Sequence, residues 1–298
     1  MQTKRQIQQL LASADISPNK RLGQHFLVDL NLMRLLVSSA GITGGDVVLE
    51  VGCGTGSLTE ALAEVACRVV AVEVDRGLAV IAKRQLEEHG NVEIINSDVL
   101  ANKSTIHPAV TSALEQAGRK CGGRTLLVGN LPYNVASPLM IDLVVGPVVV
   151  DGMFVTVQKE VAERMTALPG SREYGSLGIF FGATGDAEVM RLLKPSVFWP
   201  QPQVDSAMVS FVRRPDKTGR IANMGVFGEI VSLFMRHRRK TVRACTRFAS
   251  GRLAGVESWA EVFKVCSVDA GSRPQQLSPQ DYVSMANACR RLTGQRDL

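Results

Sequence analysis

Four consecutive residues, Asn130, Leu131, Pro132 and Tyr133, are the best candidates for chemistry in this chain. They follow an apolar run, residues 125–129, which is typical of a buried parallel strand. We expect the Asn130 side-chain oxygen and the Leu131 carbonyl to accept the two protons of a planar amine, and Tyr133 to stack on its ring. The pattern predicts an adenine base as substrate; the competing interpretation is a strand-ending turn with a packed tyrosine.

A second candidate site is the glycine-rich turn at residues 50–56, Glu-Val-Gly-Cys-Gly-Thr-Gly. It follows an apolar strand, and glycines such as Gly52 and Gly54 let the backbone turn sharply and approach a ligand closely. A helix expected from Ser57 would add free amides for an anionic group. Because Ser57 stands where a dinucleotide site needs its third small residue, the spacing favours S-adenosylmethionine over a dinucleotide. A dinucleotide site and a plain glycine turn remain as alternatives.

Two acidic residues follow the next two expected strands. Glu73 ends the strand at residues 68–73, where an acid can accept hydrogen bonds from both hydroxyls of a ribose. Asp98 follows the strand at residues 91–96 and can accept from an adenine amino group. Each acid alone could be a solvated residue in a turn. Their shared place at the carboxyl ends of successive strands predicts a ligand site, because open α/β sheets bind ligands at that edge.

The elements that must position these residues alternate between strands and helices. The expected strands are residues 46–51, 68–73, 91–96, 126–128 and 153–157. This alternation predicts an α/β fold with a parallel sheet. Ser57 and Glu60 fit a capping box at the start of the first helix. Two later apolar stretches, residues 179–183 and 207–212, predict a closing hairpin.

The composition changes at a polar segment with proline and glycine, residues 213–219. Beyond it the patterns are helical, at residues 226–234, 259–265 and 279–292. We therefore expect residues 1–213 to form the α/β domain with an N-terminal loop, and residues 214–298 to form a small helical domain.

The overall composition is that of an ordinary globular protein of 298 residues with a net charge of +6. The six cysteines form no CxxC pair and the four histidines are scattered, which argues against a disulfide framework and against a metal site. We expect a cytoplasmic protein without a membrane span, since no uninterrupted apolar stretch is long enough. The N-terminus lacks the apolar core of a signal peptide, although an organellar transit peptide remains open.

Taken together, these motifs resemble the ribosomal RNA adenine N6,N6-dimethyltransferase family, and within it the small-subunit enzymes. The resemblance covers about residues 20–290. The matching stretches are residues 22–29, 50–56, 72–75, 130–134, 158–164, 169–175, 198–206, 238–241 and 273–278.

The resemblance implies a Rossmann-like methyltransferase fold that uses S-adenosylmethionine. The implied reaction is dimethylation of two adjacent adenosines near the 3′ end of small-subunit ribosomal RNA, coupled to subunit biogenesis. The implied partner is the immature small ribosomal subunit, and the protein is implied to act as a monomer. The implied cofactor positions, with Gly54 in the same turn, are His25, Leu27, Gly52, Glu73, Asp98 and Asn130. Phe198 matches the aromatic residue that faces Tyr133 across the target base.

Residues 236–252 carry seven basic side chains and no acid. On a helix, five of the basic residues would fall largely along one stripe: Arg236, Arg239, Lys240, Arg243 and Arg247. Because like charges repel, we expect this stripe to bind RNA phosphates, with Arg172 and Lys159 extending it. A solvated helix face is the competing interpretation. Little aromatic interleaving is present, which predicts contacts to phosphate and RNA shape.

Three other functions compete with this interpretation. One is an N6-adenine methyltransferase for another nucleic acid, such as large-subunit ribosomal RNA or DNA. Another is a ribosome assembly factor whose binding role outweighs catalysis. The third is a dinucleotide-dependent oxidoreductase, which binding of NADH in place of S-adenosylmethionine would distinguish.

Overall fold

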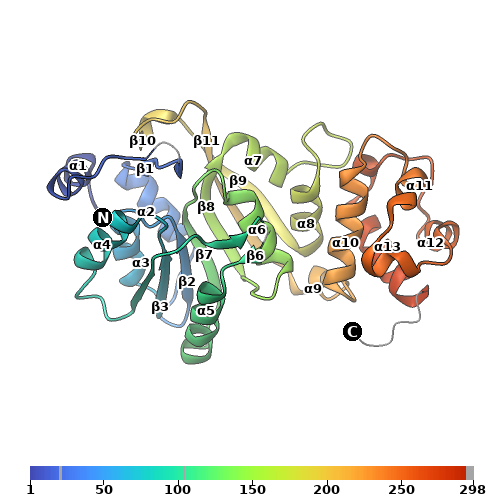
Figure 1. Ribbon diagram of the computed structural model, residues 1–298, viewed down its shortest axis with the longest axis horizontal. Coiled ribbons are helices and arrows are strands. Elements are labelled where there is room, and N and C mark those ends of the chain that lie inside the picture. The colour runs from blue at the N-terminus through green and yellow to red at the C-terminus, as the bar shows by residue number, and fades with distance from the viewer. Residues whose placement is uncertain (20–21, 104, 293–298) are drawn as a thin grey trace. The chain divides into compact units, whose positions relative to one another are not determined.

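The computed structural model describes residues 1–19, 22–103 and 105–292 (Figure 1). The chain divides into two compact units, residues 1–162 with 188–212 and residues 163–187 with 213–298. Residues 163–187 therefore lie in the second unit and not with the rest of the expected first domain. A functional domain boundary at residue 213 stays a prediction.

The strands are β1 (Phe26–Leu27), β2 (Val47–Val51), β3 (Arg68–Val72), β4 (Val92–Ile95), β5 (Leu100–Asn102), β6 (Thr105–Ile106), β7 (Thr125–Asn130), β8 (Gly152–Gln158), β9 (Gly185–Leu193), β10 (Phe198–Trp199) and β11 (Ser206–Arg213). The helices are α1 (Lys4–Ser13), α2 (Leu30–Ser39), α3 (Ser57–Ala63), α4 (Arg76–Gln85), α5 (Pro108–Cys121), α6 (Ala136–Val145), α7 (Lys159–Met165), α8 (Ser176–Thr184), α9 (Pro215–Thr218), α10 (Met224–Arg236), α11 (Val242–Cys245), α12 (Trp259–Val265) and α13 (Pro279–Leu292).

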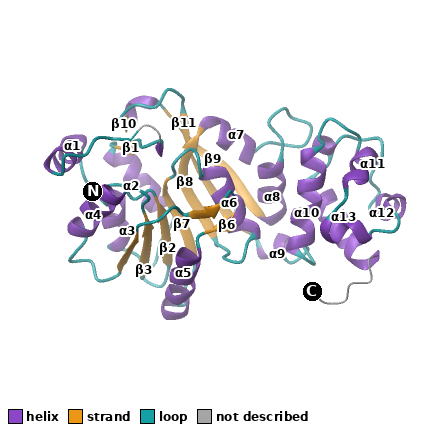
Figure 2. Ribbon diagram, viewed as in Figure 1, coloured by secondary structure: helices purple, strands orange, loops and turns teal. Residues whose placement is uncertain are grey.

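A seven-stranded sheet has the order β4-β3-β2-β7-β8-β11-β9 (Figure 2). The first five strands in this order, β4, β3, β2, β7 and β8, run parallel, and β11 is antiparallel to β8. All five residues of β2 are buried, because this central strand has neighbours on both edges and an apolar sequence. The predicted α/β fold and its five expected strands are confirmed. Since β2, β3 and β7 are parallel, their carboxyl ends meet at one edge of the sheet.

The predicted hairpin is half wrong. Residues 207–212 do lie in β11, but residues 179–183 belong to α8. Seven of the nine residues of α8 are buried, and a helix buried nearly all round has the same unbroken apolar pattern as a buried strand.

The predicted capping box at the start of α3 is also wrong. The cap residue is Gly56, with φ at +83°, and no side chain caps this end. The hydroxyl of Ser57 instead accepts a hydrogen bond from the backbone N–H of Gln2, at 2.6 Å. The N-terminal segment therefore uses the Ser57 hydroxyl that the local sequence pattern predicted to cap α3.

The helices predicted near the C-terminus are confirmed as parts of α10, α12 and α13. Buried aromatic rings fill this core, and Phe234 packs edge-on against Tyr282 with ring centroids 6.1 Å apart. The single helix expected through residues 236–252 is wrong, since α10 ends at Arg236. The chain then turns and continues as α11, where Thr241 caps the new helix by accepting from the N–H of Ala244.

Cys67 and Cys121 form a disulfide, which corrects the expectation from their spacing. Cys67 precedes β3 and Cys121 ends α5, and they are 54 residues apart in the sequence. The following strands, β3 and β7, flank β2, so the two cysteines meet at the amino edge of the sheet. Sequence spacing alone carries no sign of this pairing.

Replacing Cys67 by serine is expected to lower the free energy of unfolding by about 2–4 kcal/mol, because the crosslink restricts a long loop of the unfolded chain. Chemical denaturation with and without reductant measures the effect. Reductant should lower the midpoint of the native protein but not that of the Cys67→Ser variant. Equal midpoints for the native protein in both conditions would show that the bridge contributes nothing.

Candidate functional site

A cavity opens at the carboxyl edge of the sheet, within the first unit, and the predicted motifs surround it. Of the predicted site residues, it is lined by His25, Leu27, Gly52, Gly54, Glu73, Asp98, Asn130, Leu131 and Tyr133. Motifs that are more than 100 residues apart in the sequence thus line the same cavity.

Asn130 ends β7 with its amide held on both sides. Its Nδ2 donates to the carbonyl of His25 at 2.7 Å, and the hydroxyl of Thr156 donates to its Oδ1. A carbonyl can only accept, so the amide nitrogen faces His25 and the oxygen faces Thr156. An amide oxygen accepts two hydrogen bonds, and the Thr156 hydroxyl uses one of them. The second remains for a donor in the cavity.

Thr156 was missed by the sequence analysis. It is fully buried in β8 and lies opposite Asn130 in the parallel pairing of β7 and β8. Its carbonyl accepts the N–H of Leu131 at 3.1 Å, so it holds the backbone as well as the amide of the turn. The only sequence signal was a hydroxyl residue within an otherwise apolar strand.

Tyr133 is anchored at its hydroxyl, which lies 2.7 Å from Oγ of Ser206. Burial raises the pKa of this phenol, and the Ser206 hydrogen bond partly opposes the rise. Its ring stacks on His25, with centroids 5.6 Å apart and planes 30° apart. His25 is itself tied through Nδ1 to the carbonyl of Pro200 at 2.7 Å. Tyr133 is therefore a fixed aromatic surface at the cavity wall.

The structure does not bring Phe198 to the cavity. This side chain is 2% exposed and belongs to the core that includes Leu27, its partner in the antiparallel pairing of β1 with β10. Phe198 is not among the residues that line this cavity, and the ring that stacks on Tyr133 is His25. A role for Phe198 in holding a base stays a prediction.

The glycine turn contacts both neighbouring motifs. Gly52 has φ at +78°, and a Cβ there would lie 2.9 Å from Cγ of Pro132. Gly54 has φ at +60°, and its Cβ would lie 2.9 Å from the ring of Phe26. Only glycine permits these approaches without strain, so the turn packs directly on the Asn130–Tyr133 segment and on the N-terminal loop.

The two predicted acids differ in their surroundings. Glu73 is buried, and its carboxylate accepts the N–H groups of Gly54 and Asp75, each at 2.9 Å. Burial raises its pKa, and these backbone hydrogen bonds oppose the rise. Asp98 is exposed, and its Oδ1 accepts the N–H of Leu100 at 2.9 Å. Both line the cavity.

Glu50 is a third acid at the cavity that sequence analysis did not single out. It is 3% exposed, and its Oε2 accepts no hydrogen bond from any residue that the structure describes. Burial raises its pKa from 4.5 to about 8; the nearby Thr59 hydroxyl opposes the rise, and the charge of Glu73 adds to it. A charged residue within the apolar run 46–51 was the signal available in the sequence. A buried acid with an unpaired carboxylate oxygen favours a cationic ligand.

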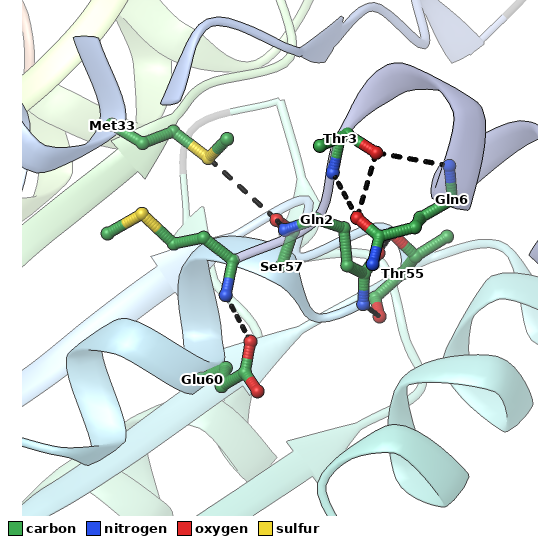
Figure 3. Close-up of polar contacts among 8 residues, drawn as sticks. Gln2, Thr3, Gln6, Met33, Thr55, Ser57 and Glu60 are labelled. Carbon is green, nitrogen blue, oxygen red and sulfur yellow. Dashed lines mark hydrogen bonds and ion pairs between the residues drawn. The ribbon is translucent and has the colours of Figure 1, made fainter. Parts of the chain in front are cut away.

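The N-terminal segment is hydrogen-bonded to the glycine turn beside the cavity (Figure 3). Thr55 donates through its hydroxyl to Gln2 Oε1 at 2.7 Å, and Gln2 Nε2 donates to the Thr55 carbonyl at 3.3 Å. Ile7 of α1 is buried beside Leu78 of α4 and lines the cavity. The sequence analysis assigned no role to these residues.

The predicted RNA-binding residues lie in both units. Arg236, Arg239, Lys240 and Arg243 are exposed in the second unit, but not along one helix stripe. Arg172 is exposed there too, and its carbonyl accepts from Arg238 Nη2 at 3.4 Å. Lys159 begins α7 in the first unit and is half-buried.

Within residues 1–19, 22–103 and 105–292, no helix is both long and apolar enough to cross a membrane. The same described residues contain no group of three or more histidine, cysteine or acidic side chains placed to hold a metal ion.

Residues 16–289 match the family described as ribosomal RNA adenine dimethylase. A protein named ribosomal RNA small subunit methyltransferase A from Pelotomaculum thermopropionicum is 36% identical over 282 residues, covering 95% of each chain. One of the same name from Geobacillus kaustophilus is 35% identical over 287 residues, covering 96% of each. A solved dimethyladenosine transferase from Plasmodium falciparum shares the fold, with a TM-score of 0.69 at 21% identity, covering 90% of this chain and 98% of that one. The chain belongs to the ribosomal RNA adenine dimethylase family.

Proposed function

We propose that this chain transfers methyl groups from S-adenosylmethionine to the N6 amines of two adjacent adenosines near the 3′ end of small-subunit ribosomal RNA. Its family and its 34–36% identity to small-subunit enzymes over most of the chain support this substrate. The observation that carries the proposal is the amide of Asn130, which is held by two hydrogen bonds and lines the same cavity as Tyr133. The chain is a ribosomal RNA adenine dimethyltransferase.

The cavity fits S-adenosylmethionine. The unpartnered oxygen of Glu50 suits a cationic ligand, and this cofactor carries ammonium and sulfonium charges. Glu73 and Asp98 line the cavity and would hold its ribose hydroxyls and adenine amine, while Gly52 and Gly54 would allow close backbone approach. The backbone of His25 and Leu27 would complete the wall. When bound, S-adenosylmethionine supplies a methyl group made electrophilic by its sulfonium.

The protein's part in the reaction is to hold the amine. An adenine amino group is a weak nucleophile, because its lone pair is delocalised into the ring. Asn130 Oδ1 and the carbonyl of Leu131 would accept its two N–H groups, which keeps electron density on the nitrogen and fixes its direction. Tyr133 would stack on the base, which is worth roughly 1–3 kcal/mol. Catalysis then comes mainly from orientation, which can supply at most about 7–11 kcal/mol.

No strong general base is needed at this site. The amine loses its proton late, when the new bond has already made it acidic, and solvent at the cavity can take it. The base must first leave its stack, which costs a few kcal/mol. A second methylation needs room for the first methyl group beside Tyr133.

Methyl transfer from tritiated S-adenosylmethionine to under-methylated small subunits tests the proposal. Digestion to nucleosides should give N6,N6-dimethyladenosine, and mapping should place it at two adjacent positions. Large-subunit particles serve as the matched control. Label in monomethyladenosine alone, or in the large subunit alone, would contradict the proposed substrate.

We further propose that the chain acts as a monomer, in the cytoplasm, on immature small subunits. Exposed cations in the second unit support an RNA partner of this size, because they can contact phosphates over a wide surface. Sedimentation of the free protein and of its mixture with precursor particles distinguishes a monomer from larger assemblies.

Replacing both Arg239 and Lys240 by glutamine is expected to flatten the salt dependence of RNA binding. Each lost phosphate contact reduces the slope of log affinity against log salt by about 0.7 to 0.9, so the double variant should lose about 1.4 to 1.8. The matched control replaces Arg220 and Lys264, two exposed cations outside this segment. An unchanged slope in the first variant would exclude a phosphate role for the pair.

A further inference from the structure

An aromatic pair on the surface of the second unit has no role in the function derived above. Phe248 is 46% exposed, unlike most large apolar side chains of the chain. Its ring lies on that of His237, with centroids 4.0 Å apart and planes 18° apart. The two residues meet because α10 ends at Arg236 and the chain turns before α11, which brings positions 11 apart together (Figure 1). A continuous helix would have separated them.

The backbone of His237 is fixed by hydrogen bonds on both sides. The N–H of His237 donates to the carbonyl of Phe234 at the end of α10, at 3.1 Å. The carbonyl of His237 in turn accepts the N–H of Lys240 at 2.8 Å, and the thiol of Cys245 lies 3.6 Å away from it. The exposed Phe248 ring stacks on this ordered residue, so the pair needs little further ordering when a base binds.

The segment that carries the pair is rich in basic residues. Lys240 Nζ lies 5.8 Å from the centroid of the Phe248 ring, within the range of a cation–π contact. Arg239, Arg243 and Arg247 are exposed on the same segment, which contains no acid. The acid Glu229 on α10 pairs with Arg252, at 3.2 Å. An exposed aromatic surface among cations matches the chemistry of an unpaired nucleotide, which has an aromatic base and a phosphate on either side.

We propose that His237 and Phe248 form a second nucleotide-binding site, where an unpaired base of the RNA stacks while Lys240, Arg239 and Arg243 contact the flanking phosphates. This inference rests on the proposed function, because it takes RNA as the substrate. The proposed site adds a contact to a base, whereas the sequence predicted that residues 236–252 contact only the phosphates and the shape of the RNA. The site binds a nucleotide of the same RNA other than the target adenosines and takes no part in methyl transfer itself.

The test compares Phe248→Leu, which keeps the apolar volume but removes the ring, with Phe248→Tyr, which keeps the ring. The full chain is titrated at several salt concentrations with a fluorescent hairpin RNA that has a single-stranded loop. A fully paired RNA with the same number of phosphates is the control. Unchanged unfolding midpoints show that both variants are folded, as expected for a half-exposed side chain.

We expect Phe248→Leu to bind the hairpin about tenfold or more weakly at every salt concentration, with the slope of log affinity against log salt unchanged. Phe248→Tyr should bind it as the native protein does, and the fully paired RNA should bind equally to all three. Stacking involves no charge, so the parallel slopes separate it from the phosphate role of Arg239 and Lys240.

Native affinity of Phe248→Leu for the hairpin would overturn the inference, as would an equal loss for the paired RNA. Methyl transfer by the native protein, measured in parallel, separates this outcome from failure of the proposed function. If the native protein methylates small subunits but Phe248→Leu binds normally, only the stacking site is wrong. If it does not methylate them but Phe248→Leu loses hairpin binding, the stacking site stands and the substrate is wrong.

Discussion

Replacing Asn130 by alanine is expected to lower the rate of methyl transfer by about 10²–10³-fold at saturating S-adenosylmethionine, with the fold intact. The effect should match the removal of a preorganised polar group from other active sites. Alanine removes the oxygen that would hold the target amine, and it also leaves the Thr156 hydroxyl and the His25 carbonyl without their partner. Single-turnover kinetics with tritiated cofactor measures the rate.

Thr156→Val provides a graded comparison. Valine keeps the shape of the side chain and the backbone contact to Leu131, but it no longer donates to the Asn130 oxygen. We expect a smaller loss than for Asn130→Ala, expressed in the rate constant of transfer and not in the affinity for S-adenosylmethionine. Turnover of Asn130→Ala within a few-fold of the native rate would refute the amine-holding role. Equal losses in both variants would instead indicate that Thr156 does more than orient the amide.

The parallel sheet could be predicted because its strands are local apolar runs of the right length. Residues 46–51 show this best, since burial on both faces leaves an almost unbroken apolar sequence. The same rule failed at residues 179–183, because a helix buried nearly all round has the same composition. Periodicity cannot separate these two cases within a short run.

Contacts between distant segments account for the other errors. Ser57 has the local sequence of a helix cap, yet Gln2 takes its hydroxyl. Cys67 and Cys121 meet only because the strands that follow them flank a third. The stacking of His237 on Phe248 depends on a turn after Arg236, and the run of basic residues gave no indication of this turn.

The sequence predicted those residues of the candidate site that lie at the carboxyl ends of strands. Asn130, Glu73 and Asp98 follow this rule and line one cavity. Phe198 does not, because its placement depends on a two-residue pairing with the N-terminal loop that no local pattern indicates. Glu50 was passed over because it stands inside an apolar strand, although a charge in that position is unusual unless a ligand or partner meets it.

Replacing Glu50 by glutamine is expected to stabilise the protein without cofactor at pH 8 and above. In the folded state its pKa is raised by burial to about 8 from an ordinary 4.5, so the folded protein binds the extra proton between these values. Stability from this group is therefore complete below pH 4.5 and falls as pH rises towards 8, by roughly 4–5 kcal/mol. Chemical denaturation of both proteins across pH 5–9 isolates this contribution, since the glutamine variant lacks it. Parallel pH profiles would contradict a neutral buried Glu50.

Binding of S-adenosylmethionine should reverse this dependence. A cation beside Glu50 favours the carboxylate, so its pKa falls on binding and a proton is released at pH 7. The affinity of the native protein should therefore rise with pH up to about 8 and then level off. Calorimetry in buffers of different ionisation enthalpy counts the released proton, and Glu50→Gln should release fewer. The variant should also bind more weakly above pH 8, where the native carboxylate is already charged. If both proteins release the same number of protons, the positive charge of the cofactor does not lie beside Glu50. The unpaired Oε2 of Glu50 would then need another hydrogen-bond donor.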